Sequence, residues 1–353
     1  MGFEGRVESC SVKAKTLKED EDLLKATRGF PPVGGSELEL VGKEGNDFII
    51  TVPSTGATVT IEDTFAEMFP MWVGRVLITA ATERWAAISA NAATGFAVSI
   101  IMSPAEAGIE KTVSSGETPD GRPGAIIQIY HTFGYGLKAQ MITRIGQCVM
   151  TCPTTAAFNA MTAAPVKMLK VGRSLSLFGD GYQEKDFVKG RQVWRIPVME
   201  GEFVIEDKFG VKRGVAGGNF LILAENQEAG LKSAEAAAEA IRKVDGTVLT
   251  FPGGVCRSGS KVGSMKYKLP ASTNHLFCPS LRSVANDSAI PEGVNSVFEL
   301  VINGTSLDAV KTAVGEGVKA AVQIPGVTKI TAANYGGKLG PYKAVLGEVL
   351  GFA

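Results

Sequence analysis

The chain has 353 residues, in which 36 Lys and Arg are balanced by 36 Asp and Glu. This balance excludes the generally basic surface of a nucleic-acid-binding protein, and it excludes a strongly acidic protein as well. The length allows two or three domains, and a hydrophobic content of 45% is enough for sizeable cores.

Cysteine and histidine usage argues against disulfides and metals. The five cysteines, at positions 10, 148, 152, 256 and 278, are odd in number and scattered, which indicates a reducing compartment. Cys148 and Cys152 have the spacing C-x₃-C, but the chain has only two histidines, His131 and His275, and no compact zinc pattern. We interpret both cysteines as apolar helix or core residues.

The sequence contains no run of about 18 apolar residues, and no hydrophobic segment follows a basic start at the N-terminus. We therefore expect a cytoplasmic protein without a membrane segment or a nucleic-acid partner. The Gly-rich runs GVAGGNF and YGGKLG lack the G-x-G-x-x-G spacing, so nicotinamide and ATP binding are not expected.

Residues 1–53 are predicted to form an N-terminal extension. The run LKEDEDLLKATRGFPP (17–32) predicts a short charged helix that ends at prolines. Residues 37–52 predict a hairpin, because apolar residues alternate around a KEGN turn. We expect this extension to cover a sheet edge or to lengthen a subunit contact. A separate regulatory or binding module is the alternative.

The rest of the chain contains a faint internal repeat. VTIEDTF (59–65) recurs as FVIEDKF (203–209), and each copy precedes an apolar strand, at 75–80 and 219–225. Alanine-rich helices are predicted next, with apolar residues at helical spacing in the second. They span residues 81–94 and 229–244.

The parallel continues with a Pro-acid-Gly turn, a strand and a helix in each half. The turn and the strand together span residues 119–131 and 291–304, and the helices are predicted at 137–150 and 307–322. Each half then has the order β-α-β-β-α-β, which predicts an α+β fold of two ferredoxin-like lobes with large loop inserts. The domains are accordingly residues 1–53, 54–202 and 203–353.

One strand carries an unusual carboxylate. The run SVFELVING (296–304) places Glu299 among apolar residues, and a charged side chain there is costly unless it is paired, protonated or functional. Alternation also allows Glu299 simply to face solvent, opposite Phe298 and Leu300. Three loop-like segments precede it, FPGG, SKVGS and LPASTN. They supply N–H groups and hydroxyls without bulk, which suggests uncharged acyl chemistry rather than a metal or phosphate site.

From about Thr58 to the C-terminus, the chain resembles the formylmethanofuran:tetrahydromethanopterin formyltransferases. The resemblance rests on motifs in a fixed order, which include the three segments before Glu299. The others are IEDTFAE (61–67), RVLITA (75–80), ATGF (93–96), PAEAGIE (104–110), ETPDGRPG (117–124), RIGQCVMTCPT (144–154), LFGDGYQ (177–183), VWRIPVMEGEF (193–203), GVAGGNF (214–220) and GGKLG (336–340).

This resemblance implies transfer of a formyl group between the amine nitrogen of formylmethanofuran and N5 of tetrahydromethanopterin, in methanogenesis or its reverse. The reaction would run through a ternary complex, with methanofuran and tetrahydromethanopterin as carrier co-substrates and no prosthetic group. The resemblance also implies two lobes joined near residue 202 in a homo-oligomer, a tetramer built as a dimer of dimers. The alternatives are a formyltransferase subunit of a bacterial formyltransferase/hydrolase complex and a non-catalytic pterin-binding scaffold.

Within this resemblance, Glu299 matches a buried glutamate that handles protons, either as a relay between the two amines or as a neutral acid that donates to the oxyanion. The other candidates are predicted to bind substrate through loop N–H groups, hydroxyls and a basic cluster. They are Asp180, Tyr182, Gln183, Pro252, Gly253, Gly254, Ser260, Lys261, Ser264, Ser272, Thr273 and Asn274.

Each of these loops also has a plain structural interpretation. FPGG fits an ordinary type II turn, and SKVGS with its neighbours Arg257, Lys266 and Lys268 fits a solvated loop. PASTN fits turn closure, and GDGYQ fits an Asx-type turn with a packed tyrosine. His275 stands where the resemblance leads us to expect an acidic residue, so it adds a titrating group beside the predicted site.

Overall fold

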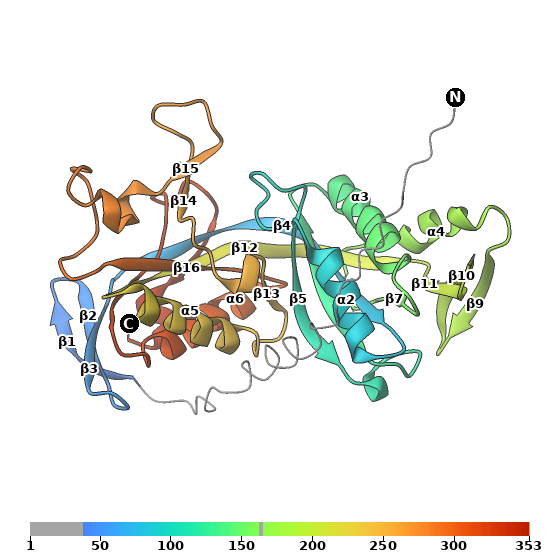
Figure 1. Cartoon of the computed structure of the whole chain (residues 1–353), viewed down its shortest axis with the longest axis horizontal. Helices are drawn as coiled ribbons and strands as arrows, with labels where there is room; N and C mark the ends of the chain where they lie inside the picture. Colours follow the sequence, from blue (N-terminus) through green and yellow to red (C-terminus); the bar gives the residue numbers. More distant parts are fainter. Residues whose placement is uncertain (1–37, 162–164, 353) are drawn as a thin grey trace, which may run out of the picture. The chain divides into compact units, whose positions relative to one another are not determined.

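The computed structural model describes residues 38–161 and 165–352. They form an α+β fold, as predicted, in which helices pack on one large sheet (Figure 1). The charged helix expected at 17–32 lies outside the described residues. The hairpin expected at 37–52 is present as β1 (Glu39–Glu44) and β2 (Asp47–Val52).

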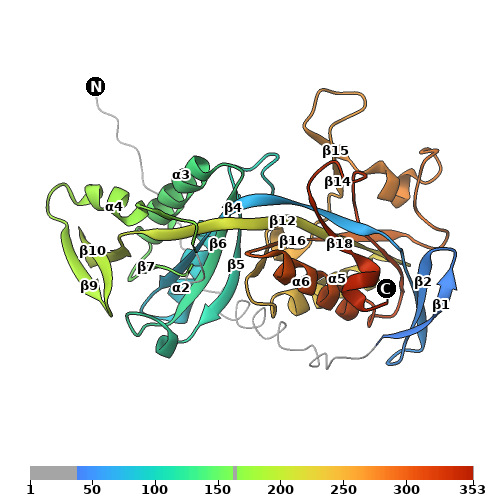
Figure 2. The same cartoon turned by 180° about the vertical axis from the view of Figure 1, so that it is seen from behind.

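Two long antiparallel strands join the halves of the sheet. They are β4 (Phe65–Thr79) and β12 (Phe209–Ala224), which lie side by side in both Figure 1 and Figure 2. The full length of these strands is not apparent in the sequence, because polar or irregular residues interrupt the apolar pattern in the middle of each strand. Pro70 of β4 cannot donate a ladder hydrogen bond, and β12 carries a bulge where Gly217 has φ +87°.

Each half of the chain repeats one order of elements. In the first half, the strands lie in the order β7-β4-β6-β5, with α2 after β4 and α3 after β6. In the second half, the order is β17-β12-β16-β13, with α5 after β12 and α6 after β16. All these neighbours are antiparallel, so the repeat in the sequence corresponds to a repeat in topology.

The bounds of these elements are α2 (Glu83–Thr94), β5 (Glu106–Val113), β6 (Gly124–His131), α3 (Gly134–Arg144), β7 (Ala156–Asn159), α5 (Gln227–Ile241), β13 (Thr247–Leu249), β16 (Ser296–Gly304), α6 (Leu307–Ala321) and β17 (Val327–Thr331). The remaining elements are β3 (Ala57–Ile61), β8 (Lys167–Leu169), α4 (Val171–Leu175), β9 (Glu184–Val188), β10 (Arg191–Val198), β11 (Gly201–Glu206), β14 (Ser260–Val262), β15 (Ala271–Thr273), β18 (Tyr342–Val345) and α7 (Leu346–Leu350).

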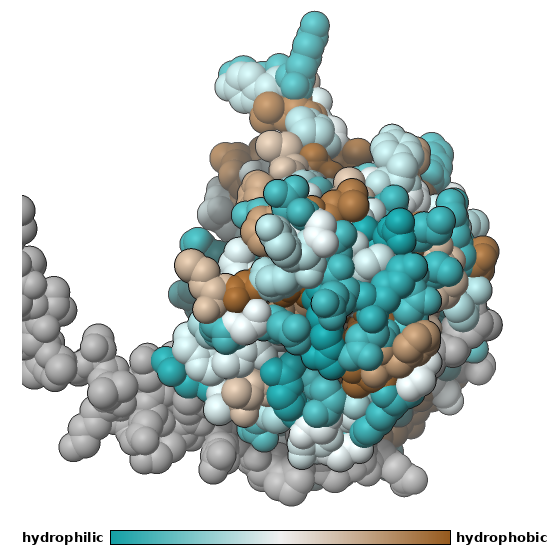
Figure 3. Space-filling view, turned by 90° about the vertical axis from the view of Figure 1, so that its right-hand side faces the viewer, coloured by the Kyte–Doolittle hydropathy of each residue, from teal (hydrophilic) through white to brown (hydrophobic). Residues whose placement is uncertain are grey.

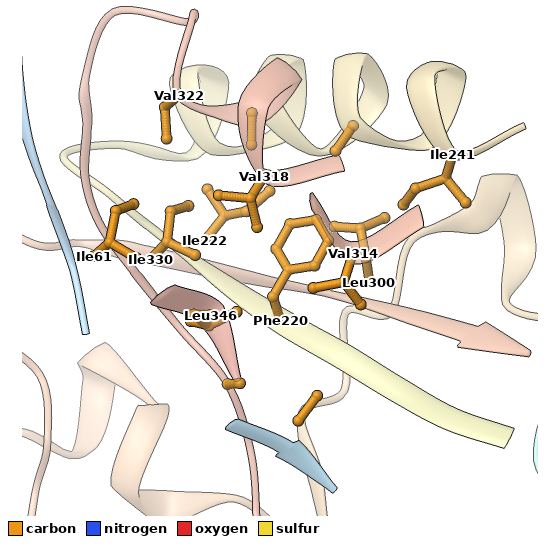
Figure 4. Close-up of a cluster of buried hydrophobic side chains, with 14 of the residues drawn as sticks. Ile61, Phe220, Ile222, Ile241, Leu300, Val314, Val318, Val322, Ile330 and Leu346 are labelled. Atoms are coloured by element: carbon orange, nitrogen blue, oxygen red, sulfur yellow. The ribbon is translucent and has the colours of Figure 1, made fainter. Parts of the chain in front are cut away.

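The first strand of each half of the chain pairs with a strand of the other half. β3 pairs in parallel with β17, and β11 pairs in parallel with β7. Ile61 of β3 is therefore buried with Phe220, Leu300 and the helices α5 and α6 (Figure 4), whereas Ile205 of β11 is buried in the core around α2 and α3. Each core thus draws on both halves of the sequence, and the division near residue 202 stays a prediction.

The N-terminal hairpin extends the sheet beyond β3. β2 pairs with β3, and its alternate residues Phe48, Ile50 and Val52 are buried in the core of α5 and α6. The ring centroid of Phe48 lies 5.6 Å from that of Phe352. The hairpin therefore covers the edge of β3, while β1 is exposed along its whole length.

The opposite end of the strand order carries β10 and β9. Figure 3 views the structure from this side, where the surface is mainly hydrophilic with separate hydrophobic spots. Arg195 of β10 forms ion pairs there with Asp186 and Glu202. Most of the predicted site residues lie elsewhere, in the loops around β16.

Candidate functional site

Glu299 lies on the face of β16 that is turned away from the core of α5 and α6. Its neighbours Phe298 and Leu300 are buried in that core, so alternation places Glu299 on the other face. This face does not meet open solvent, because the insert between β13 and β16 covers it. Residues of the insert and the sheet form a small apolar cluster there: Leu221, Leu223, Phe277, Ile290, Val294, Val297 and Ala333.

The Glu299 carboxyl group shares a small cavity with the insert. The cavity has a volume of about 40 Å³, and Cys256, Asn274 and Phe277 help to line it. Leu221 of β12 lies directly opposite Glu299 in the sheet. The residue retains some exposed surface, but no ion pair joins it to any described residue.

Burial raises the pKa of the Glu299 carboxyl to about 7, and a hydrogen bond with the Cys256 thiol opposes this rise. Both protonation states are therefore populated near neutrality. A group of this kind can accept and return a proton with little cost in either direction. The arrangement suits acid–base chemistry on an uncharged acyl group held against the insert.

The segments SKVGS and PASTN pair with each other near this cavity. They form the hairpin β14–β15, in which Ser260 lies opposite Thr273 and Lys261 opposite Ser272 (Figure 1). The Asn274 backbone N–H donates to Gly259 O at 2.7 Å. The hairpin therefore brings the predicted hydroxyls and the lysine together at the base of the insert.

Two hydroxyl groups of this hairpin form hydrogen bonds with the backbone of the hairpin itself. Ser272 Oγ donates to Gly263 O at 2.7 Å, and Ser264 Oγ accepts from Tyr267 N–H at 3.0 Å. The Ser272 contact corresponds to the turn-closure interpretation of PASTN. Ser260 and Thr273 are exposed.

Lys261 lies at one end of a chain of two hydrogen bonds that runs through His275 to Asp287. Lys261 Nζ lies 2.6 Å from His275 Nδ1, and His275 Nε2 lies 3.0 Å from Asp287 Oδ2. An ammonium group has donors only, so Nδ1 accepts and the Nε2 proton points at the carboxylate. The hydrogen bond from His275 lowers the pKa of Asp287. The His275 side chain is only 17% exposed, so its hydrogen bond fixes the position of the Lys261 ammonium group.

The FPGG segment lines a different cavity. Gly253 has φ 65° and ψ 0°, and the Gly254 N–H donates to Phe251 O at 2.8 Å, which is the geometry of a type II turn. This N–H is therefore used inside the turn. Arg242 holds the turn through Gly253 O at 2.8 Å. The cavity has a volume of about 660 Å³ and is also lined by the end of α2 and by β5.

The GDGYQ segment is not brought to Glu299 within one chain. Asp180 has φ 50°, and Gln183 Oε1 accepts from the Gly181 N–H at 2.9 Å, so the segment is a closed turn before β9. Tyr182 is 79% exposed rather than packed, so the packed-tyrosine interpretation is wrong. In the strand order, β9 lies several strands away from β16.

Sequence reasoning did not predict a role for Cys256 or Glu67. Cys256 forms an isolated bridge with Glu299, and a single bridge leaves no periodic pattern to recognise. Glu67, the last residue of IEDTFAE, is fully buried and accepts hydrogen bonds from the loop that contains GGKLG. Glu67 lies among the apolar residues Phe65, Ala66, Met68 and Phe69 of β4, the same kind of pattern that distinguishes Glu299 in SVFELVING.

Comparison with known proteins now identifies the family. The profile described as formylmethanofuran-tetrahydromethanopterin formyltransferase matches residues 55–198, and the profile described as FTR, proximal lobe, matches residues 201–349. The chain belongs to this family. The resemblance seen in the motifs is thereby confirmed, and with it the class of enzyme. Residues 1–54 lie outside both matches.

Relatives of this formyltransferase chain are similar over nearly their whole length. The formyltransferase of Methanocaldococcus jannaschii is 58% identical over 82% of this chain and 98% of its own, and that of Methanopyrus kandleri is 55% identical over the same shares. The solved Methanosarcina barkeri formyltransferase superposes with a TM-score of 0.80 at 51% identity, over 82% of this chain and 98% of its own.

A bacterial structure is also similar. The formyltransferase/hydrolase complex of Methylorubrum extorquens, solved with methylofuran, contains a chain with a TM-score of 0.79 at 40% identity, covering 83% of this chain and 97% of its own. In the described part of this chain, no helix is long and apolar enough to span a membrane. Its described residues contain no group of three or more potential metal ligands.

Proposed function

We propose that the chain transfers a formyl group between the amine nitrogen of formylmethanofuran and N5 of tetrahydromethanopterin, with Glu299 as the proton relay. The observation that carries this proposal is a carboxyl group with a pKa of about 7, enclosed in a small cavity between the sheet and the insert that precedes β16. The high identity to named formyltransferases supports the reaction.

The steps follow from the chemistry of transamidation. N5 attacks the formyl carbon, which forms a C–N bond and a tetrahedral oxyanion. Glu299 takes the proton that the attacking nitrogen loses. It then gives this proton to the methanofuran nitrogen as the original C–N bond breaks, so no proton is gained or lost overall. In the alternative role, neutral Glu299 donates to the oxyanion.

Activity of the purified chain with both carriers, followed spectrophotometrically, tests this proposal. We expect Glu299→Gln to lower kcat by about 10² to 10⁴-fold with little change in KM. Glu292→Gln is the matched control, because Glu292 is exposed in the turn before the same strand. An inactive wild type that still binds pterin would instead favour the partner-dependent complex or the scaffold.

We propose that Lys261 binds an acidic group of a co-substrate, a carboxylate of the furan cofactor or the phosphate of the pterin. The contact with His275 leaves the ammonium with further N–H donors, already fixed in direction. Lys261→Met should raise one KM about tenfold to a hundredfold, the range of a charge-assisted hydrogen bond. An unchanged KM for both carriers would place Lys261 outside the site, and Lys266→Met, on the exposed part of the loop, is the control.

We further infer that the two halves are ferredoxin-like lobes and that the protein is a cytoplasmic homo-oligomer, a tetramer built as a dimer of dimers. The repeated antiparallel strand order supports the lobes. The described cysteines are free thiols, which supports a reducing compartment. Because the GDGYQ turn does not reach Glu299 within one chain, a second copy would have to supply it to the site. Mass measurement of the native protein tests the assembly.

A further inference from the structure

A buried cysteine adjoins the carboxyl group of Glu299. Cys256 N–H donates to Glu299 O at 2.8 Å, and Glu299 N–H donates to Cys256 O at 3.1 Å. Residues that exchange both hydrogen bonds across an antiparallel bridge carry their side chains on the same face of the sheet. The two side chains therefore lie together, and both line the same small cavity. Cys256 is only 2% exposed.

The Cys256 thiol keeps its proton in this environment. Burial raises the pKa of the thiol, and the negative charge of Glu299 raises it further. A protonated thiol is a hydrogen-bond donor, and Glu299 is the charged acceptor beside it. On the other side, Cys256 Sγ lies 3.4 Å from Ser258 Oγ. The thiol is thus held between a hydroxyl and the carboxyl group.

We propose that Cys256 is a positioning residue for the formyl transfer, which donates its S–H to the Glu299 carboxylate and fixes the orientation in which that carboxylate meets the substrate. This inference rests on the proposed role of Glu299. The donated hydrogen bond favours the carboxylate and so opposes the effect of burial. Cys256 itself forms no bond to the formyl carbon, because the thiolate and not the thiol is the nucleophile.

The test compares Cys256→Ala, which removes the donor, with Cys256→Ser, which keeps one. In Cys256→Ala, the pH midpoint of kcat should move upward and kcat at pH 7 should fall about twofold to tenfold, the range of one ordinary hydrogen bond. KM should not change. Cys256→Ser should stay close to the wild type. Cys148→Ala is the control, because Cys148 is partly buried and packs against the core of α2 and α3.

A second readout separates this inference from the proposed function. The carboxyl band of Glu299, assigned in the infrared spectrum by its loss in Glu299→Gln, reports the protonation of this group directly. Its midpoint should rise in Cys256→Ala. An unchanged infrared midpoint overturns the inference, and so does a shifted infrared midpoint with an unchanged rate profile. A Glu299→Gln variant with the wild-type rate profile means that the proposed role of Glu299 has failed.

One further outcome would reverse the role of the cysteine. If Cys256→Ala and Cys256→Ser are both inactive, and mass spectrometry of the wild type finds a formyl group on Cys256, the thiol is a nucleophile and the inference is wrong. Urea unfolding of both variants shows whether they are folded. Because each substitution is small, a fold defect in one does not remove the other from the test.

Discussion

Neutralising Glu67 should destabilise the loop that contains GGKLG. The Glu67 side chain is fully buried in β4. One of its oxygens accepts from the N–H groups of Tyr335 and Gly337, at 2.7 and 3.3 Å, and the other accepts from Leu339 and, at 3.0 Å, from Gly340. Four backbone donors of one loop therefore depend on a single carboxylate.

The size of the effect follows from this geometry. Glu67→Gln replaces one oxygen by an NH₂ group, so two of the four N–H donors lose their acceptor. Each buried donor without a partner costs about 1–3 kcal/mol, which gives about 2–6 kcal/mol in the free energy of unfolding. Glu62→Gln is the control, because its ion pair with Lys329 lies nearer the surface and contributes about 1 kcal/mol or less.

Urea unfolding measures the loss of stability, and trypsin cleavage after the exposed Lys338 reports opening of the loop. Burial by itself raises the pKa of Glu67, but the four N–H donors outweigh it and hold this pKa below its ordinary value of 4.5. The contribution is therefore complete above pH 4.5 and is lost as the pH falls through the lowered folded-state pKa. Equal stability and equal cleavage of Glu67→Gln and wild type at pH 7 would refute this reasoning.

Two further substitutions test buried contacts, one between β4 and β5 and one between β4 and the loop that contains GGKLG. Arg75→Leu leaves the Glu110 carboxylate, whose side chain is 1% exposed, without its bidentate partner, and urea unfolding should show a loss of about 3 kcal/mol; a loss below about 1 kcal/mol would contradict a buried pair. Gly340→Ala would bring a Cβ to 2.1 Å from Met68 O and should cost about 1–3 kcal/mol. Gly116→Ala, which meets nothing within 4 Å, is its control, and equal stability of the two variants would contradict the packing.

The local elements could be predicted well because their patterns are periodic. The turn and strand expected at 291–304 end in β16 (Ser296–Gly304), and the helix expected at 307–322 is α6 (Leu307–Ala321). The helix expected at 137–150 is α3 followed by a π-helical turn, Ile145–Val149. Apolar alternation or helical spacing fixes each of these within its own segment.

The long-range features could not be predicted in the same way. The parallel pairing of β3 with β17 and of β11 with β7 joins segments far apart in the chain, and no local pattern encodes it. The same holds for the contact of Cys256 with Glu299 and for the chain of hydrogen bonds from Lys261 through His275 to Asp287. For Glu299, alternation correctly placed the side chain opposite Phe298, but only the tertiary structure shows that an insert covers that face.

The pH dependence of kcat, measured for the wild type and for Glu299→Gln, tests the central claim most directly. As a relay, Glu299 must begin as the carboxylate that takes a proton from the attacking nitrogen. The account therefore predicts that kcat rises with pH through about 7 and that this step disappears in the variant. A kcat that falls as the pH rises through this value would assign Glu299 to the oxyanion. A step that survives in Glu299→Gln would contradict the account.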